Sequence, residues 1–396
     1  MPVYLPEKYK KQLPADIGNE ETEKVLAEMI AEIESVYGQA YTELKAKADN
    51  YLAWFVAEDA AQRERLKNGD ISVKEYQNWR ERKLLTGQHW FAMSETMAQN
   101  LANSNGIAMS IISDYIPEVY AINGNWTTYQ IEHQLKINTS FELYDHQTIE
   151  RLIRDHPDLL PQPKVNIPLD MRWNTQNLQS AVMQSILQGE SVDQLADRLA
   201  GVSDMNKTSA IRNAKTMTTS AQNGGRQAAM ERAETLGIKG KKMWVSTLDH
   251  HTRASHIDLD GEIVGIHDKF SNGLMFPGEA GGEPAEIYNC RCREVEVFDD
   301  QDIHNAERAS RLDNHLGEMT YDEWKESHRE GKQFRAAANV NRDYSMMREY
   351  RQLLGSKVPT NIKEFQKIKY NEPDKWKQWI SEARKARAER RRQNGG

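Results

Sequence analysis

Two cysteines, Cys290 and Cys292, are the residues whose types and spacing most clearly suggest chemistry. They are the only cysteines among 396 residues, and they flank one arginine in the stretch NCRC. Alternate residues of an extended segment face the same side, so both thiols can point at one centre. Thiolates are good zinc ligands, and a neutral imidazole completes mixed sites. With His256 as the third ligand, the sequence predicts a zinc site.

A fourth ligand is expected from the side chains around His256. Asp249 belongs to the predicted set, and His250, His251 and His267 are the alternatives. The sequence also leaves simpler interpretations of the two cysteines open. They can be ordinary buried thiols, which are common for this residue. A disulfide across a single residue would be strained, and a reducing compartment disfavours it.

The composition favours two or three domains built from helices with narrow apolar stripes. Hydrophobic residues make up 38% of the chain and charged residues 28%, while nine tryptophans and fifteen tyrosines argue against general disorder. The net charge of -7 gives no chain-wide case for nucleic-acid binding. Neither a signal peptide nor the roughly 18 apolar residues of a membrane span is recognisable, so a cytosolic chain without a membrane partner is expected.

An apolar stripe predicts one long helix near the start of the chain. Its members are spaced four and three residues apart, which places them on one helical face. They are Leu26, Ile30, Ile33, Tyr37, Ala40, Leu44, Ala48, Tyr51 and Phe55. A packed bundle helix explains this stripe, and an intermolecular coiled-coil or docking helix is the alternative.

The next segments are predicted to be helical over residues 71–119 and then to change character. Residues 122–145 mix turn residues with β-branched and aromatic residues, so short strands or loops are expected there. Four of the twelve prolines lie in residues 155–170. Because proline removes a donor and restricts its neighbour, this segment is the main candidate for a domain boundary.

The elements that must position the cysteines come after this boundary. An amphipathic helix can end at Gly189 in a left-handed cap, and Ser191 and Gln194 form a capping box for a second helix. An alanine-rich helix is expected over residues 207–236. From residue 240 the stretches KKMWV, DGEIVGI and CREVEVF are β-like. The His and Cys groups are therefore expected on a small strand-and-loop unit held against helices.

The same residues resemble the phage Mu F-like head morphogenesis family, which comprises minor head proteins of tailed bacteriophages. The resemblance rests on a Trp-Asp-Thr-Arg-His-Asp-Gly pattern, a loop with glycine and proline, and then NCRCR. The matching residues are Trp244, Asp249, Thr252, Arg253, His256, Asp260, Gly261, Pro277, Asn289, Cys290, Arg291 and Cys292. The resemblance covers roughly residues 168–380. One departure is Lys215-Thr216-Met217, where such proteins often have an acid in the third position.

Several of these residues have structural interpretations of their own. Asp260 and Gly261 are expected to form a turn, because this pair accepts positive φ easily. Trp244 is expected in the core. Arg253 is expected to form an ion pair with Asp249 or Asp258.

The resemblance implies a structural minor capsid protein, not an enzyme, in the virion head interior near the portal. Its implied partners are the portal protein and the major capsid or scaffold protein, and its implied roles are procapsid assembly and DNA packaging or delivery. A metal-dependent nuclease around His256 and Asp249 is one alternative. The other is a toxin-like transferase, because Mu F-like modules occur fused to toxin domains. The chain after Phe298 shows no Gly-rich loop or catalytic pair that supports a transferase.

The stretch ARKARAERRR, from Ala383 to Arg392, has six basic residues and one acidic residue. Such a run can bind DNA without sequence preference by releasing counterions. It can equally be a solvated helix end, where cations complement the helix dipole. Trp376 and Trp379, just upstream, are expected to bury one helical face and not to stack on bases.

Together these patterns predict an α+β, predominantly α-helical protein with a small strand-and-loop subdomain that carries the His/Cys cluster. Residues 1–160 are expected to form an N-terminal helical domain for assembly and docking. Residues 168–300 would form the Mu F-like module. Residues 301–396 would form a helical C-terminal extension with a basic tail.

Overall fold

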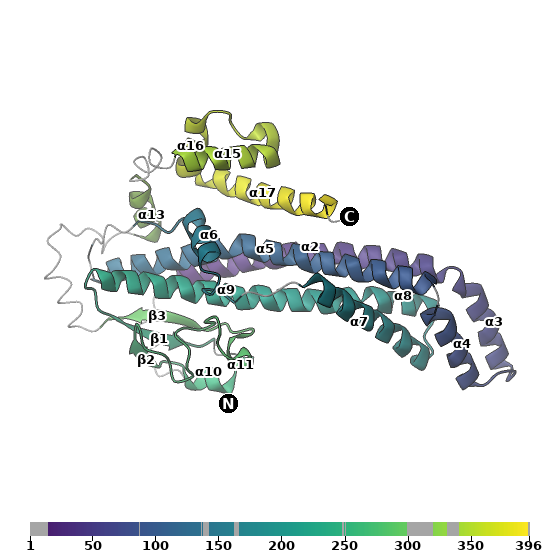
Figure 1. The fold of residues 1–396 in the computed structure, drawn as a ribbon. Helices are drawn as coiled ribbons and strands as arrows, with labels where there is room; N and C mark the ends of the chain where they lie inside the picture. Colours follow the sequence, from purple (N-terminus) through teal and green to yellow (C-terminus); the bar gives the residue numbers. More distant parts are fainter. Residues whose placement is uncertain are drawn as a thin grey trace. The chain divides into compact units, whose positions relative to one another are not determined.

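The computed structural model describes residues 15–394 with the exception of residues 87, 136, 138–141, 162–165, 248, 250, 299–319 and 331–339 (Figure 1). Contacts divide the chain into two compact units. Unit 1 combines Met1–Glu28, Ile112–Gln162 and Asn213–Asn394, and unit 2 combines Met29–Ile111 and Pro163–Arg212. The change of unit at Gln162 falls in the proline-rich segment, but the first 160 residues contribute to both units. The division into residues 1–160, 168–300 and 301–396 therefore stays a prediction.

Unit 2 is helical and has one core. It contains α3 (Phe55–Lys67), α4 (Val73–Leu85), α7 (Ile167–Gln188) and α8 (Val192–Ala200), with parts of α2 (Ile17–Leu52), α5 (Gln88–Leu135) and α9 (Val202–Thr235). The core draws buried residues from all seven helices, among them Leu44, Phe55, Leu84, Leu101, Leu178, Leu195 and Val202. Burial of this apolar surface is the main favourable contribution to the stability of the unit.

The predicted N-terminal stripe is buried from Ile33 onward, which supports the packed-bundle interpretation. The predicted length of the helix is wrong at its end, because α2 stops at Leu52 and Phe55 begins α3. Helix boundaries were better predicted where a local cap exists. Ser191 caps α8, and Gly189 ends α7 with φ 66°, as its left-handed cap requires.

The prediction of strands or loops over residues 122–145 is wrong for its first part, because α5 continues to Leu135. The β-branched, aromatic and polar side chains there are used for packing. Trp126 and Ile131 are buried. Asn123 is also buried and donates hydrogen bonds to Thr22 Oγ1 at 2.7 Å and to the Val119 carbonyl at 3.0 Å. Tertiary contacts thus outweigh the weak helix propensity of this stretch.

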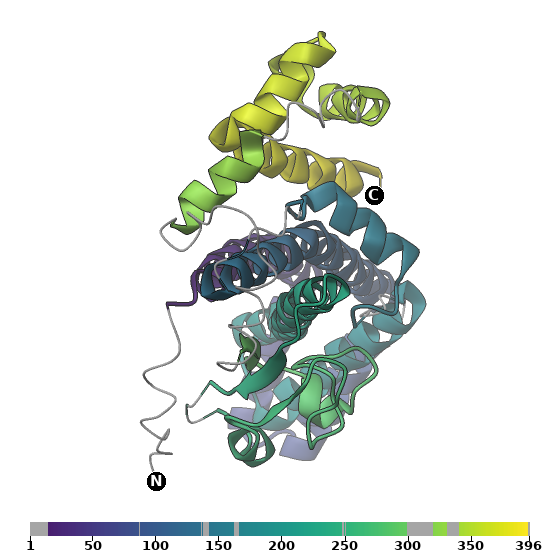
Figure 2. The same ribbon diagram turned by 90° about the vertical axis from the view of Figure 1, so that its left-hand side faces the viewer.

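The strands of unit 1 form one antiparallel sheet in the order β2-β1-β3, as the β-like stretches predict. They are β1 (Lys241–Val245), β2 (Ile263–Gly265) and β3 (Arg293–Val297), with the short helices α10 (Ala254–Asp258) and α11 (Pro284–Ile287) between them. Trp244 pairs with Glu294 across β1 and β3 and is fully buried, as predicted. The strands lie beside α9 in both ribbon views (Figures 1 and 2).

Helix α9 supplies the hydrogen bonds that another strand would give to the chain around β3. Four buried polar residues, spaced three and four apart, form one stripe on α9. Their side chains bond the backbone of residues 289–294. The pairs are Thr216 with Asn289 N–H, Thr219 with Cys290 C=O, Asn223 with Cys292 C=O and Glu294 N–H, and Arg226 with Glu294 C=O. The stripe therefore satisfies polar backbone groups that burial would otherwise leave unpaired.

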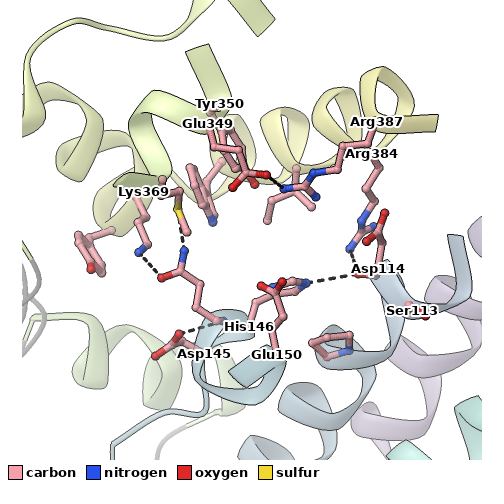
Figure 3. Close-up of a pocket in the computed structure, with 16 residues that line it drawn as sticks. Ser113, Asp114, Asp145, His146, Glu150, Glu349, Tyr350, Lys369, Arg384 and Arg387 are labelled. Carbon is pink, nitrogen blue, oxygen red and sulfur yellow. Dashed lines mark hydrogen bonds and ion pairs between the residues drawn. The ribbon is translucent and has the colours of Figure 1, made fainter. Parts of the chain in front are cut away.

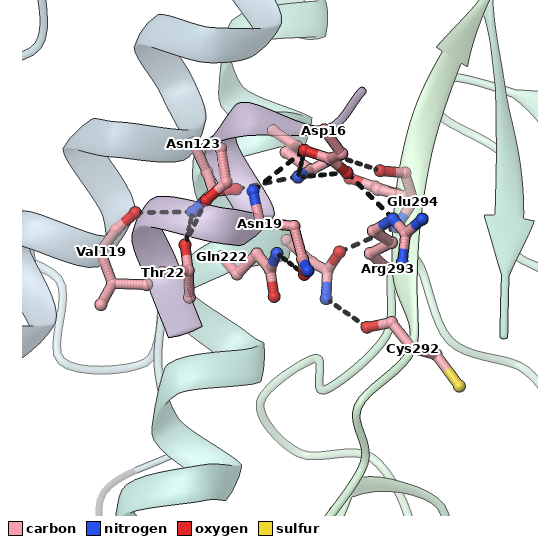
Figure 4. Close-up of polar contacts among 12 residues, drawn as sticks. Asp16, Asn19, Thr22, Val119, Asn123, Gln222, Cys292, Arg293 and Glu294 are labelled. Atoms are coloured by element: carbon pink, nitrogen blue, oxygen red, sulfur yellow. Dashed lines mark hydrogen bonds and ion pairs between the residues drawn. The ribbon is translucent and has the colours of Figure 1, made fainter. Parts of the chain in front are cut away.

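Asp16, just before α2, joins α9 and β3 through two ion pairs (Figure 4). Its carboxylate lies 2.8 Å from Arg226 Nη2 and 2.9 Å from Arg293 Nε. Burial acts to raise the pKa of Asp16, but the two guanidinium groups outweigh it and hold the pKa below its ordinary value. Arg226 is only 1% exposed, so Asp16 is needed to balance its buried positive charge.

Replacing Asp16 by asparagine is expected to lower the free energy of unfolding by about 3 kcal/mol at neutral pH, because the buried Arg226 loses its charged partner. The difference from wild type should shrink as the pH falls through the lowered pKa of Asp16, where the carboxylate is protonated in both states. Urea denaturation at pH 7 and at about pH 3 measures this. Asp322→Asn, which removes an exposed partner of Lys325, is the control and should change little. Equal losses in both variants would contradict the prediction.

The C-terminal part of unit 1 is helical, as predicted. It contains α13 (Tyr321–Glu330), α15 (Val340–Leu354), a 3-10 turn (Gly355–Lys357), α16 (Ile362–Asn371) and α17 (Pro373–Asn394). Trp379 is buried and Trp376 half-buried in one cluster with Tyr350 and Phe365, so these rings do pack on one helical face. None of the helices in the described residues is long and apolar enough to cross a membrane.

Candidate metal centre

His256, Cys290 and Cys292 form the candidate site. One nitrogen of His256 and the two sulfurs all lie within 4.8 Å of one another. His256 Nδ1 is 3.3 Å from Cys292 Sγ and 3.7 Å from Cys290 Sγ. All three residues are buried, with exposed fractions of 1% or 2%. The structure thus brings together the three side chains predicted from the sequence.

The three ligands come from two segments, and neighbouring elements hold each segment in place. Cys290 and Cys292 precede β3, and α9 fixes their carbonyls through Thr219 and Asn223. His256 lies on α10, where its carbonyl accepts a hydrogen bond from Ser246 Oγ. The rings of His256 and Trp244 form a T-shaped pair, with their centroids 5.3 Å apart and 77° between their planes. Two segments that are distant in sequence therefore converge on one buried point.

Glu286, on α11, is a site residue that the sequence analysis missed. Its Oε2 lies 3.0 Å from His256 Nε2, and Ser255 and Asn272 donate further hydrogen bonds to its carboxylate. Metal-binding histidines commonly donate their second N–H to a carboxylate, which fixes the tautomer and the orientation of the ring. With its Nε2 directed to Glu286, His256 turns Nδ1 toward the two sulfurs. A single glutamate in a polar loop gives no pattern from which this role could be predicted.

Asp249, the fourth predicted ligand, lies outside this group. It is exposed and paired with Arg291 at 2.5 Å. The hydrogen bonds from Arg291 and from the backbone of His251 hold the pKa of Asp249 well below its ordinary range. Arg253 donates a hydrogen bond to the carbonyl of Tyr288, and Asp249 pairs with Arg291. The predicted ion pair of Arg253 with Asp249 or Asp258 is therefore wrong.

The histidines considered as alternatives are placed elsewhere or not described. His251 is exposed. His267 pairs with Glu234. His250 lies outside the described residues. Within the part of the chain that the structure describes, the group therefore has three protein ligands and no fourth.

The electrostatics of the group favour one thiolate. Cys292 has a pKa lowered to about 4, because Cys290 and His256 donate hydrogen bonds to its sulfur and outweigh the effect of burial. The pKa of Cys290 is raised, because its thiol keeps the proton that it donates to Cys292 and because it is buried. Burial lowers the pKa of His256, but Cys292 and Glu286 raise it above the ordinary value. A thiolate beside a thiol and an imidazole is a donor set that suits Zn²⁺.

The fold and the site define a class: a mainly helical protein whose small antiparallel sheet carries a buried His/Cys group packed against a helix. Residues 176–295 match the model of the family described as phage Mu protein F like protein, which supports the family resemblance of this part of the chain. The match includes the later part of α7, all of α8, α9, β1 and β2, the start of β3 and all three clustered residues.

Three curated proteins are similar to this chain. Minor head protein GP7 of Bacillus phage SPP1 is 26% identical over 236 residues, which are 58% of this chain and 76% of that protein. The NAD(+)--arginine ADP-ribosyltransferase EFV of Enterococcus faecalis is 30% identical over 213 residues, or 51% of this chain and 41% of that protein. An uncharacterized protein of Haemophilus influenzae is 27% identical over 189 residues and is covered to 39%. The chain thus spans less than half the length of two of these relatives. No solved structure matches it.

Proposed function

We propose that this chain is a structural minor capsid protein of a tailed phage that acts in head morphogenesis from the interior of the head, next to the portal. Two comparisons support the proposal. The family match covers residues 176–295, and the similarity to a minor head protein extends over 76% of that protein. The structural observation that carries it is the burial of His256, Cys290 and Cys292, because a buried cluster can stabilise a fold but is closed to a large substrate.

In this proposal the cluster binds zinc and holds the strand-and-loop unit together. The imidazole and the two sulfurs are suitable donors, and they lie close enough to share one ion. Zinc binding of this kind contributes directly to folding free energy. Asp249 remains the proposed fourth ligand, and binding would require its carboxylate to leave Arg291.

We propose that the chain is not an enzyme. Cys292, His256 and Glu286 do stand in the order of a nucleophile, a base and an orienting acid, which is an arrangement used in covalent catalysis. However, the sulfur of such a nucleophile must be reachable, and Cys292 is 2% exposed. The similarity to an ADP-ribosyltransferase covers 41% of that protein, which leaves most of its length outside the match.

The enzyme question has a direct test. Purified chain, incubated with NAD⁺ and an arginine-rich acceptor protein, is expected to release no nicotinamide and to leave the acceptor unmodified. ADP-ribose on the acceptor, absent when Cys292 is replaced by serine, would overturn the proposal of a purely structural role.

The location in the head is tested by assembling capsids in cells that express this chain with the portal, scaffold and major capsid proteins of its own phage. Purified capsids should contain the chain, and protease should cleave it only after the capsids are opened. Capsids assembled without the portal should contain much less of it. A chain that stays in the supernatant, or that is cleaved in intact capsids, would contradict an interior position.

DNA contact through the basic C-terminal run is the second proposed interaction. The run lies on α17, as the sequence predicts for a helix end. Lys385 and Arg390 are exposed on it, whereas Arg384 is buried and 6% exposed. Arg384 is therefore packed within the chain, and Lys385 and Arg390 remain on the exposed surface of the helix.

A further inference from the structure

The helices α15, α16 and α17 form a segment with its own core. The buried members of that core all come from residues 347–383. They are Met347, Tyr350, Val358, Phe365, Ile368, Trp379 and Ala383. We call Val340–Asn394 the C-terminal segment. Because its apolar residues pack on one another, its fold does not require the contacts described next.

Arg384, on α17, attaches this segment to α5 (Figure 3). Its guanidinium lies 3.1 Å from Glu118 Oε2 and 3.2 Å from the carbonyl oxygen of Asp114, and it stacks 3.8 Å from the ring centre of Tyr115. A second polar contact joins Lys369 to Gln147 on α6 (His146–Asp155) at 3.0 Å. The contacts of the C-terminal segment with α5 and α6 thus depend on charged groups.

These contacts surround a cavity of about 350 Å³. Its walls carry both charged and aromatic groups, including His146, Glu150, Tyr350, Trp376 and Arg387 (Figure 3). Because a cavity of this size lies at the contact, the two sides do not pack directly on each other over that area. Separation is therefore opposed mainly by the ion pair and hydrogen bonds, which weaken in salt or when a competing anion is present.

Pro117 lies at the centre of the α5 side of this contact. It lacks an N–H and cannot donate to the carbonyl of Ser113 within the helix. The neighbouring carbonyl of Asp114 accepts hydrogen bonds from two side chains that come from other helices, Arg384 and His146. The turn from Asp114 to Glu118 therefore offers a carbonyl and a carboxylate to one guanidinium.

Other arginines of the basic run are also paired within the chain. Arg387 donates to Glu349 at 2.7 Å, and Arg390 donates to the carbonyl of Gln352. Guanidinium groups bind carboxylates and phosphates with the same planar geometry, so a phosphate group can replace a carboxylate partner.

We propose that the contact of Arg384 with the Asp114–Glu118 turn is a latch that competes with the phosphate backbone of nucleic acid for the basic face of α17. The proposal rests on the proposed DNA contact. When the latch is closed, the carboxylate of Glu118 and the carbonyl of Asp114 bind the guanidinium of Arg384. When nucleic acid is present at low salt, phosphates take the place of Glu118 and the C-terminal segment leaves α5.

The test compares two variants of the full chain that remove one negative charge from the walls or rim of this site. Glu118→Gln removes the partner of Arg384, and Glu150→Gln removes an exposed carboxylate that lines the same cavity. Affinity for a mixed-sequence DNA duplex is measured by fluorescence anisotropy at several salt concentrations. Glu118→Gln should bind about fivefold more tightly than wild type, the lower end of typical coupling between linked equilibria. Glu150→Gln should bind like wild type.

A third variant, Glu118→Gln combined with Arg384→Gln, separates the latch from a general charge effect. It should lose the gain in affinity, and its salt slope should be shallower than that of Glu118→Gln by about 0.9, the value for one phosphate contact. Equal affinity gains in Glu118→Gln and Glu150→Gln would overturn the latch.

Hydrogen exchange distinguishes failure of the latch from failure of the DNA proposal. Without DNA, residues of α5 around Asp114–Glu118 should exchange faster in Glu118→Gln than in wild type or Glu150→Gln. Faster exchange with no DNA binding by any variant would support a latch and overturn nucleic acid as the competitor. Unchanged exchange together with unchanged affinity would overturn the latch itself, whether or not the wild-type chain binds DNA.

Discussion

Replacement of Cys290 and Cys292 together by serine is expected to abolish zinc binding and to cause the largest loss of stability of any change considered for this chain. Both sulfurs and His256 Nδ1 lie within 4.8 Å of one another and are buried, so the variant loses two of three ligands. Structural zinc contributes about 10–16 kcal/mol in small zinc-binding domains. Even a fraction of this is large beside the roughly 5–15 kcal/mol that stabilises a typical protein. Elemental analysis should find about one zinc per wild-type chain and none in the variant, whose melting temperature should fall sharply.

Two single variants refine this prediction. Glu286→Gln keeps all three ligands but weakens the acceptor for His256 Nε2–H, so it should retain zinc with an affinity about 10–100-fold lower. Asp249→Asn tests the fourth ligand, and lower zinc affinity would assign that position to Asp249. A wild-type chain that contains no metal, and that melts at the same temperature as the double serine variant, would refute the zinc proposal.

The second large effect is expected from Gly225→Ala on α9. A Cβ atom at this position would lie 2.4 Å from the carbonyl oxygen of Tyr120 and 3.1 Å from the backbone nitrogen of Gly124. Both neighbours are backbone atoms of α5, so the helices must separate to admit a methyl group. Overpacking of this kind typically costs about 1–3 kcal/mol, and we expect a value at or above the upper end because no flexible side chain can yield. Urea denaturation measures the free energy of unfolding.

Gly38→Ala, on α2, is the matched control, because a Cβ there has nothing within 4 Å. Alanine is a better helix former than glycine, so this variant should be stabilised by about 0.5–1 kcal/mol. Opposite signs for the two glycine variants would support the close contact of α5 and α9. A stabilised Gly225→Ala would show that these two helices do not approach so closely.

Local features of the fold were predictable because their causes are local. The capping box at Ser191 and the left-handed glycine at Gly189 each depend on a few adjacent residues. The strands around Trp244 followed from β-like composition. His256, Cys290 and Cys292 were predicted from ligand chemistry and spacing, supported by the family resemblance.

Features that depend on distant partners could not be predicted in this way. The helix through Trp126 looked like strands or loops because its β-branched and aromatic residues pack on other segments. The role of Glu286 depends on α11 reaching His256, 30 residues away. Asp249 was predicted as a metal ligand from its position in the motif, but its ion pair with Arg291, 42 residues further along the chain, was not predicted.

The polar stripe of α9 has a consequence for recombination between genes. The carbonyls of Cys290 and Cys292 accept hydrogen bonds from Thr219 and Asn223, so a segment that begins at β1 would carry these carbonyls into a new host protein without their α9 partners. The smallest segment that could be transferred to another protein with these hydrogen bonds intact must therefore include α9. The family match begins at residue 176 and includes this helix. In a chimaera, the helix and the sheet would have to come from the same parent.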